Sequence, residues 1–152
     1  MLSPGSAAPE FELPDETGQT VSLSSMLAAG PLILYFYPAD FTPGCTKEAC
    51  SIRDIHDDLL SVGLQVIGVS PQDGESHARF QTQYKLPFKL LSDVDKVAVK
   101  AYDVDGPFGV GVRRVTYLIG EDGNIEDAVQ ADVLVGKHAD FIENAIRLRQ
   151  QS

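Results

Sequence analysis

The sequence is poor in cysteine, tryptophan and basic residues. It has two cysteines and no tryptophan, and its 12 Lys and Arg residues are outnumbered by 22 Asp and Glu residues, for a formal net charge of -10 at pH 7. Two cysteines are too few for a scaffold stabilised by disulfides. The scarcity of basic residues argues against binding to the phosphate backbone of nucleic acids and against docking on an anionic membrane.

Long apolar segments are also missing. No apolar run approaches the roughly 18 residues that a membrane-spanning helix requires. Residues 1–5 lack the basic and apolar regions of a secretory signal. We therefore expect a cytoplasmic protein, and in that reducing compartment cysteines are more often reactive or metal-binding than structural.

The composition is typical of one folded α/β domain. Hydrophobic residues make up 43% and charged residues 22% of the 152 positions, so we expect a single domain over residues 1–152. The continuous apolar run at residues 32–37 predicts a central strand buried on both faces. Other segments predict an N-terminal hairpin over 11–13 and 20–23, strands at 66–70, 114–119 and 124–129, and helices at 45–63, 75–84, 95–102 and 138–149.

Strands that alternate with helices in this order indicate a mixed central sheet with helices on both faces, and the thioredoxin-like fold is one architecture of this kind. The helix predicted from residue 45 has inward positions at Ala49, Ile52, Leu59 and Leu60.

The two cysteines lie at the start of this helix. A loop over residues 38–44, with two prolines and a glycine, joins the central strand to Cys45, and Cys50 follows five residues later. The first turn of a helix offers unpaired N–H groups and a partial positive charge, and both favour thiolate over thiol. Cys45 is therefore a candidate nucleophile.

The spacing of the cysteines limits what they can form. On an ideal helix their Cα atoms lie roughly 8.7 Å apart, whereas a disulfide requires about 4.4–6.8 Å. A bond between Cys45 and Cys50 therefore requires the first helical turn to unwind. The pair alone leaves open that both are small buried hydrophobes. A zinc site is disfavoured, because His56, His77 and His138 show no ligand spacing with the cysteines. A thioredoxin-type dithiol is also disfavoured, because it has the spacing Cys-x-x-Cys, whereas this chain has Cys-x-x-x-x-Cys.

The segment 36–50, FYPADFTPGCTKEAC, resembles the active-site loop of the peroxiredoxins. It is most similar to the atypical two-cysteine branch called bacterioferritin comigratory protein or peroxiredoxin Q. Residues 8–15, 69–70, 90–93 and 114–119 match further segments in the family's order. Two features depart from the family pattern: Gly120 stands where an acidic residue is common, and the segment 103–112 is shorter than in many relatives.

The resemblance implies a thioredoxin-like fold and a thiol-dependent peroxidase that uses neither a metal nor an organic cofactor. Cys45 is then the peroxidatic nucleophile, which attacks hydrogen peroxide or an alkyl hydroperoxide and becomes a sulfenic acid. Cys50 resolves this acid as the intramolecular disulfide Cys45–Cys50, and thioredoxin or a glutaredoxin-type reductant restores the thiols. No nucleic acid or membrane is an expected partner, and the lack of a broad exposed apolar stripe favours a monomer.

The resemblance also assigns roles to residues around the thiol. Thr42 holds the thiolate and the peroxide through its hydroxyl, and Pro38 shields the sulfur from water. Glu48 resembles the acid that pairs with the family's arginine, although a Glu in the first helical turn also favours the helix dipole unaided.

Two adjacent arginines compete for the role of that arginine. Because neighbours on a strand point in opposite directions, only one of Arg113 and Arg114 can face the site. The family's arginine lies two residues before a Thr or Ser, here Thr116, and this selects Arg114 to stabilise the thiolate and the transition state by its charge.

Two other functions are compatible with the fold. A thiol–disulfide oxidoreductase needs no peroxide, but the Cys-x-x-x-x-Cys spacing and Thr42 argue against it. A redox-inactive binding module is disfavoured because Cys45, Thr42 and Arg114 are all present. Consumption of peroxide distinguishes the first of these from a peroxidase.

Overall fold

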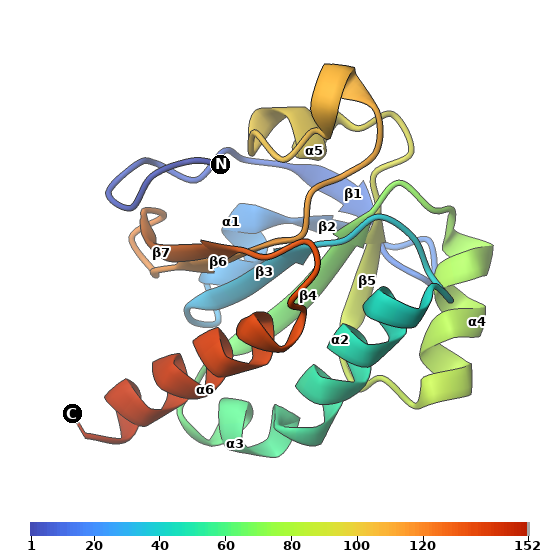
Figure 1. The fold of residues 1–152 in the computed structure, drawn as a ribbon. Coiled ribbons are helices and arrows are strands. Elements are labelled where there is room, and N and C mark those ends of the chain that lie inside the picture. The colour runs from blue at the N-terminus through green and yellow to red at the C-terminus, as the bar shows by residue number, and fades with distance from the viewer. Residues whose placement is uncertain (152) are drawn as a thin grey trace.

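The computed structural model describes residues 1–151 and is built around a five-stranded mixed sheet (Figure 1). Its strand order is β5-β4-β3-β6-β7. The central strand β3 pairs in parallel with β4 and antiparallel with β6. The strands are β3 (Leu32–Phe36), β4 (Gln65–Ser70), β5 (Lys89–Ser92), β6 (Val115–Ile119) and β7 (Ile125–Gln130).

Helices cover both faces of this sheet (Figure 1). One face carries α2 (Pro43–Asp54), α3 (His56–Ser61), α4 (Gly74–Tyr84) and α6 (Gly136–Gln150). The other face carries α1 (Leu23–Leu27), α5 (Val97–Ala101) and the hairpin of β1 (Glu12–Pro14) and β2 (Thr20–Ser22). A short 3-10 turn, Pro107–Gly109, lies in the connection between α5 and β6. The three-layer α/β architecture predicted from the sequence is confirmed.

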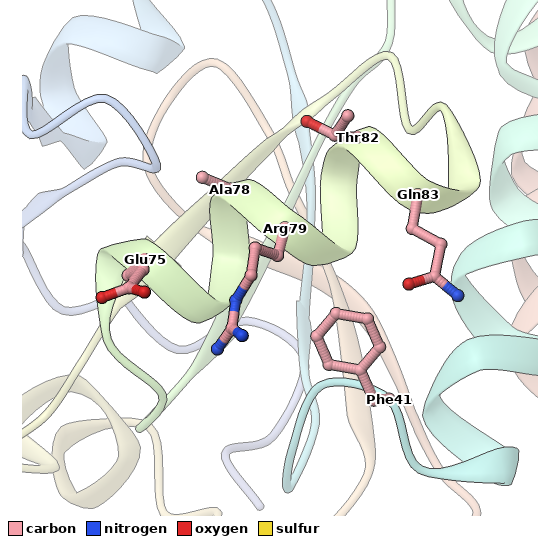
Figure 2. Close-up of a pocket in the computed structure, with 6 residues that line it drawn as sticks. All are labelled: Phe41, Glu75, Ala78, Arg79, Thr82 and Gln83. Atoms are coloured by element: carbon pink, nitrogen blue, oxygen red, sulfur yellow. The ribbon is translucent and has the colours of Figure 1, made fainter.

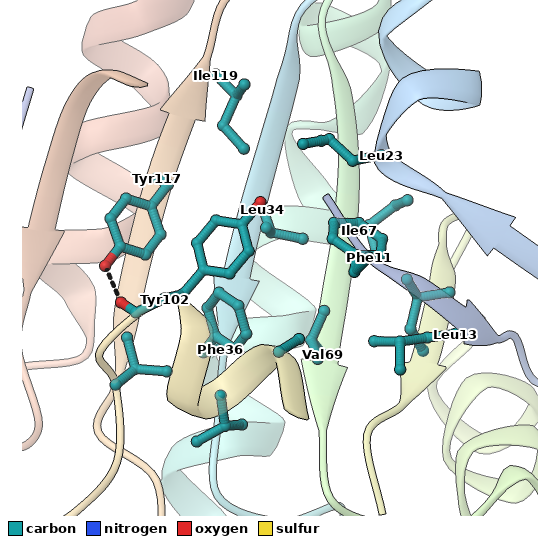
Figure 3. Close-up of a cluster of buried hydrophobic side chains, with 14 of the residues drawn as sticks. Phe11, Leu13, Leu23, Leu34, Phe36, Ile67, Val69, Tyr102, Tyr117 and Ile119 are labelled. Carbon is teal, nitrogen blue, oxygen red and sulfur yellow. Dashed lines mark hydrogen bonds between the residues drawn. The ribbon is translucent and has the colours of Figure 1, made fainter. Parts of the chain in front are cut away.

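β3 is buried on both faces because its side chains alternate between two cores. Leu32, Leu34 and Phe36 pack with the hairpin, α1 and α5, and Figure 3 shows Leu34 and Phe36 in this core. Ile33 and Tyr35 pack on the opposite side, against α2, α4 and α6. Burial of each such apolar side chain stabilises the folded state by about 1.5–3 kcal/mol relative to leaving it exposed. The end of β3, from which the loop to Cys45 departs, is therefore rigidly held.

The pairing of β3 with β6 brings two distant parts of the chain together. Phe36 at the end of β3 is paired with Val115 at the start of β6. The loop that follows β3 and the residue that precedes β6 therefore emerge side by side, although they are far apart in the sequence.

The structure differs from the sequence prediction in several elements. β5 was not predicted, because its four residues are too few to show a period. The helix expected over 45–63 begins earlier, at Pro43, and is interrupted at Ile55, whose φ of -109° and ψ of 9° are not helical. As a result Leu60, predicted to face inward, is 53% exposed. Leu23, predicted at the end of a strand, begins α1. The hairpin, β3, β4, β6, β7, α4 and α6 are confirmed with shifts of a few residues at their ends.

Within residues 1–151, no helix is both long enough and apolar enough to cross a membrane.

Candidate active site

Cys45 is the third residue of α2 and is almost completely buried, with 1% of its surface exposed. Thr42, in an extended conformation, is the residue before the helix, and Pro43 occupies the first helical position. Proline suits that position because its fixed φ matches the helix and its missing N–H group would have no intrahelical partner. The backbone of the loop thus begins the helix just ahead of the thiol, where the helix dipole favours a negative charge.

The Arg114 guanidinium contacts the Cys45 thiol directly. Its Nη1 donates a hydrogen bond to Sγ at 3.0 Å, and the side chain is buried. The backbone N–H group of Arg114 is held in turn by Asp132 Oδ1 at 2.8 Å. Arg113 is only half-buried, and its backbone N–H group donates to Val104 O at 2.8 Å. Of the two adjacent arginines, the structure therefore brings Arg114 to the sulfur.

Gly44 leaves the space that this approach needs. A Cβ atom at residue 44 would lie 2.8 Å from Arg114 Nη2 and 3.3 Å from its Cζ. The first distance is shorter than real Cβ contacts and the second is shorter than most of them, and the atoms that would have to move belong to the end of a flexible side chain. A larger residue at 44 would therefore displace the guanidinium without disturbing the backbone around it.

Thr42 and Pro38 lie in the same loop as expected, but their polar atoms have local partners. The Thr42 hydroxyl donates to Ala39 O at 3.1 Å. Pro38 is half-buried, and its carbonyl accepts a bond from the Ser70 hydroxyl at 3.4 Å. Thr42 must release Ala39 O before its hydroxyl can donate a hydrogen bond to another group, whereas its oxygen remains able to accept one.

Glu48 lies one turn after Cys45 on the same helix and is 2% exposed. Its Oε1 is 3.5 Å from Arg114 Nη1, and its Oε2 is 3.5 Å from His138 Nδ1. Neither oxygen has a hydrogen-bond partner among the described residues. Burial raises the pKa of Glu48 to about 8, although the charge of Arg114 acts in the opposite direction. Because α2 begins at Pro43, Glu48 is not in the first turn, and the expectation that it favours the helix dipole from that turn is wrong.

Cys50 is half-buried on α2, and both thiols are free. The helix is continuous from Pro43 through Asp54, so the two cysteines lie on a formed helix. The geometric argument from the sequence therefore applies to this state: a bond between the sulfurs requires this part of α2 to rearrange.

Asp40 anchors the active-site loop to α4, a contact that the sequence did not suggest. Its carboxylate accepts bonds from the hydroxyls of Tyr37 and Ser76, both at 2.7 Å, and lies 2.7 Å from His77 Nδ1. His77 Nε2 lies 3.0 Å from Leu91 O, so both ring nitrogens face oxygen atoms. Asp40 and His77 are buried and 37 positions apart, and no motif or period links them.

Phe41 provides a second contact between the loop and α4. Its backbone has a φ of 65°, which is unusual for a residue other than glycine. Its ring packs against Phe80 and Tyr84, with centroids 5.1 and 6.5 Å away. Phe41 lines a hollow of about 730 Å³ on the surface of α4. Figure 2 shows its ring beside this helix. The residues that line this hollow with Phe41 are Glu75, Ala78, Arg79, Thr82 and Gln83. None of the residues that contact the thiol lines it.

His138, in the first turn of α6, is the other site residue that sequence reasoning missed. It is fully buried, and its Nδ1 lies 2.8 Å from Thr116 Oγ1 as well as near Glu48. A histidine so far along the chain from the cysteines gives no sequence signal, because only the packing of α6 on α2 brings it to the site.

Comparison with known proteins identifies related chains. The sequence model of the AhpC/TSA family matches residues 4–128. A chloroplastic peroxiredoxin Q of rice, Oryza sativa subsp. japonica, is 45% identical over 126 residues, which are 82% of this chain and 58% of the rice protein. A putative peroxiredoxin bcp of Coxiella burnetii is 44% identical over 140 residues, which cover 88% of this chain and 91% of that protein. This chain thus spans little more than half the length of the rice relative.

Solved structures of related proteins have the same fold. The peroxidoxin BcpB of Mycobacterium tuberculosis superposes with a TM-score of 0.90 at 34% identity, over 97% of this chain and 98% of that chain. Peroxiredoxin Q of Xanthomonas campestris superposes with a TM-score of 0.84 at 28% identity, over 97% and 96% of the two chains. The thioredoxin-like arrangement predicted from the resemblance is confirmed.

Proposed function

We propose that this chain, which belongs to the AhpC/TSA family and is a homologue of peroxiredoxin Q and bcp proteins, is a thiol-dependent peroxidase acting on hydrogen peroxide and organic hydroperoxides. The observation that carries the proposal is the 3.0 Å contact from Arg114 Nη1 to the Cys45 sulfur at the start of α2. A cation and a helix N-terminus at one buried thiol are the conditions that favour a nucleophilic thiolate.

The first step is attack of the Cys45 thiolate on one oxygen of the peroxide. The S–O bond forms as the O–O bond breaks, and the leaving hydroxide or alkoxide takes up a proton to give water or an alcohol. Arg114 stabilises the charge that moves from sulfur to the leaving oxygen, because its position is set before the reaction by β6 and Asp132. Thr42 turns its hydroxyl from Ala39 O to the peroxide, and Pro38 limits the access of water.

The second step resolves the sulfenic acid within the chain. Cys50, as thiolate, attacks the Cys45 sulfur, the S–S bond forms, and the hydroxyl group leaves and is protonated to water. A dithiol protein such as thioredoxin or a glutaredoxin-type reductant then reduces the disulfide by thiol–disulfide exchange and becomes oxidised in its place. No metal or organic cofactor is required for either step.

A direct assay tests this function. Purified protein is supplied with hydrogen peroxide or an alkyl hydroperoxide and with a thioredoxin system or dithiothreitol, and the loss of peroxide is followed. We expect peroxide consumption that depends on the dithiol. If the protein exchanges disulfides with the dithiol but consumes no peroxide, it is a thiol–disulfide oxidoreductase and the proposal is wrong.

Oxidation is expected to unwind the start of α2. The spacing of Cys45 and Cys50 forbids a disulfide on an intact helix, and opening a helix end costs much less than global unfolding. Hydrogen exchange followed by mass spectrometry should therefore show faster exchange of residues 46–51 in the disulfide form than in the dithiol form. α4 serves as the internal control, since its exchange should change little. A crystal structure of the disulfide form in which α2 is unchanged would contradict this prediction, because the disulfide would then have formed without unwinding the helix.

Substitution of Gly44 by alanine is expected to slow peroxide reduction about ten- to hundred-fold, because small misplacements of catalytic groups have effects of this size. The added methyl group would lie 2.8 Å from Arg114 Nη2, which is too close, and it forces the guanidinium away from its present position. Stopped-flow measurement of the reaction with peroxide gives the rate constant.

The matched control for this variant is Gly74→Ala, because a Cβ at residue 74 meets only Asp15 O, at an ordinary 3.8 Å. It should react at the wild-type rate. A Gly44→Ala protein that is folded and reacts as fast as the wild type would show that Arg114 does not need its present position.

A further inference from the structure

Three ionisable groups from three parts of the chain surround the Glu48 carboxyl group. Cys45 precedes it on α2, Arg114 approaches from the start of β6, and His138 approaches from α6. Arg114 Nη1 is shared, since it lies 3.0 Å from Cys45 Sγ and 3.5 Å from Glu48 Oε1. The charge of Glu48 therefore decides whether the guanidinium faces one anion or two.

The hydrogen bonds of His138 define its protonation in the neutral ring. Nε2 lies 2.9 Å from Ala131 O, and because a carbonyl oxygen only accepts, Nε2 carries the hydrogen. Nδ1 then carries the single lone pair of the ring, which accepts a hydrogen bond from the Thr116 hydroxyl at 2.8 Å. Burial lowers the pKa of His138, and the charge of Arg114 lowers it further, so the neutral ring is favoured at neutral pH.

The surroundings of Glu48 fit a protonated carboxyl group better than a carboxylate. Both oxygens are buried without a hydrogen bond, and the cost of this burial for an ion outweighs the opposing attraction of Arg114, whose Nη1 is 3.5 Å from Oε1. Oε2 lies 3.5 Å from His138 Nδ1, so a protonated carboxyl group is the second candidate donor to that lone pair, in place of the Thr116 hydroxyl. A carboxyl proton is attracted by that lone pair, whereas a carboxylate is repelled by it. Tyr35, which is also nearby, is buried and uncharged, so it does not stabilise a carboxylate at Glu48 by charge.

We propose that Glu48 and His138 hold one titratable proton between them as a buried, neutral pair, and that His138 is thereby a positioning residue which keeps the charge of Arg114 available to Cys45. The inference rests on the proposed peroxidase function. At neutral pH the proton is on the Glu48 carboxyl group and the ring of His138 is neutral, so the pair carries no charge. Loss of the proton leaves a carboxylate beside Arg114, which then competes with the Cys45 thiolate for the single guanidinium.

The charges around the pair support this assignment. Arg114 and His138 face Glu48, while the thiolate of Cys45 and the carboxylate of Asp132 are the nearby negative groups. Asp132 is already bound to the backbone N–H of Arg114. With Glu48 protonated, Arg114 and the thiolate balance each other.

The test uses the reduced full-length protein and two readouts. Heteronuclear NMR of the imidazole nitrogens reports the tautomer of His138, and stopped-flow kinetics report the reaction of Cys45 with hydrogen peroxide as a function of pH. In the wild type we expect the Nε2–H tautomer at neutral pH. We further expect a change in the Nδ1 resonance and a fall in the peroxide rate at the same alkaline pH, near the value of about 8 to which burial raises the pKa of Glu48.

Three variants test whether His138 shares a proton with Glu48 or has only a structural role. In Glu48→Gln, whose amide cannot ionise, the alkaline step in both readouts should disappear. In His138→Phe the acceptor for the carboxyl proton is lost, so the alkaline fall in rate should move to lower pH by on the order of one pH unit. In His138→Asn, whose Oδ1 can accept in place of Nδ1, the fall should return toward its wild-type pH. Circular dichroism establishes that each variant is folded.

Other outcomes would overturn the inference. An alkaline step that persists in Glu48→Gln shows that another group titrates. A doubly protonated His138 at neutral pH, seen by NMR, shows that the pair does not hold a single proton. If His138→Phe folds and its alkaline fall stays in place, His138 has only a structural role. A protein that reduces no peroxide at any pH refutes the proposed function, whereas the NMR titration still decides whether Glu48 and His138 share the proton.

Discussion

Cys45→Ser is expected to abolish peroxide reduction, while Cys50→Ser should carry out one round of reduction and then stop. A serine hydroxyl is not ionised near neutral pH, so it provides no nucleophile at the position that Arg114 and the start of α2 prepare. Without Cys50 the sulfenic acid still forms, but no intramolecular disulfide is available for a dithiol protein to reduce.

Two measurements distinguish these variants. Single-turnover consumption of peroxide should be stoichiometric with protein for Cys50→Ser and absent for Cys45→Ser, and steady-state turnover with thioredoxin should be lost in both. Mass spectrometry of Cys50→Ser after one equivalent of peroxide should find the added oxygen on Cys45. If Cys50→Ser shows no single turnover, the roles of the two cysteines are reversed or wrong.

Arg114→Ala is expected to slow the attack on peroxide about 10²–10³-fold, the usual effect of removing one donor that stabilises a transition state. The variant loses the only guanidinium that an observed contact places on the Cys45 sulfur within residues 1–151.

Arg113→Ala is the matched control, because it removes the same charge one residue away. Arg113 is half-exposed and its backbone bond to Val104 does not depend on its side chain, so the rate should change little. Equal losses in the two variants, or a loss confined to Arg113→Ala, would contradict the choice of Arg114. Arg114→Lys should recover only part of the rate, because an ammonium lacks the fixed fork of a guanidinium.

Much of the fold could be predicted because it depends on local patterns. A run of apolar residues predicts β3, and alternating or helical periods predict the hairpin, α4 and α6. The position of Cys45 at a helix start also follows from the residues around it, since Pro43 and Gly44 favour a turn into a helix. The choice of Arg114 over Arg113 required the family resemblance, and the structure agrees in placing Arg114 on the sulfur.

The remainder depends on contacts between distant segments. The interruption of the helix at Ile55 has no proline or glycine to mark it. β5 is a strand because it pairs with β4, and its four residues alone do not indicate one. His138 and the Asp40–His77 pair lie at the site because whole helices pack there, and the neutral state favoured for Glu48 is a product of burial. Sequence patterns report which residues are inward-facing, but not which inward-facing residues meet.

The antiparallel pairing of β3 with β6 also affects when the site forms during synthesis and folding of the chain. Cys45 and Arg114 are separated by 69 positions, and they meet only when Phe36 has paired with Val115. Pairings over such long separations form late, because the loop between them must be closed first. During synthesis, the helix that carries Cys45 emerges from the ribosome well before the arginine does. The contact of Arg114 with Cys45, on which the proposed function depends, is therefore made only when the sheet is complete.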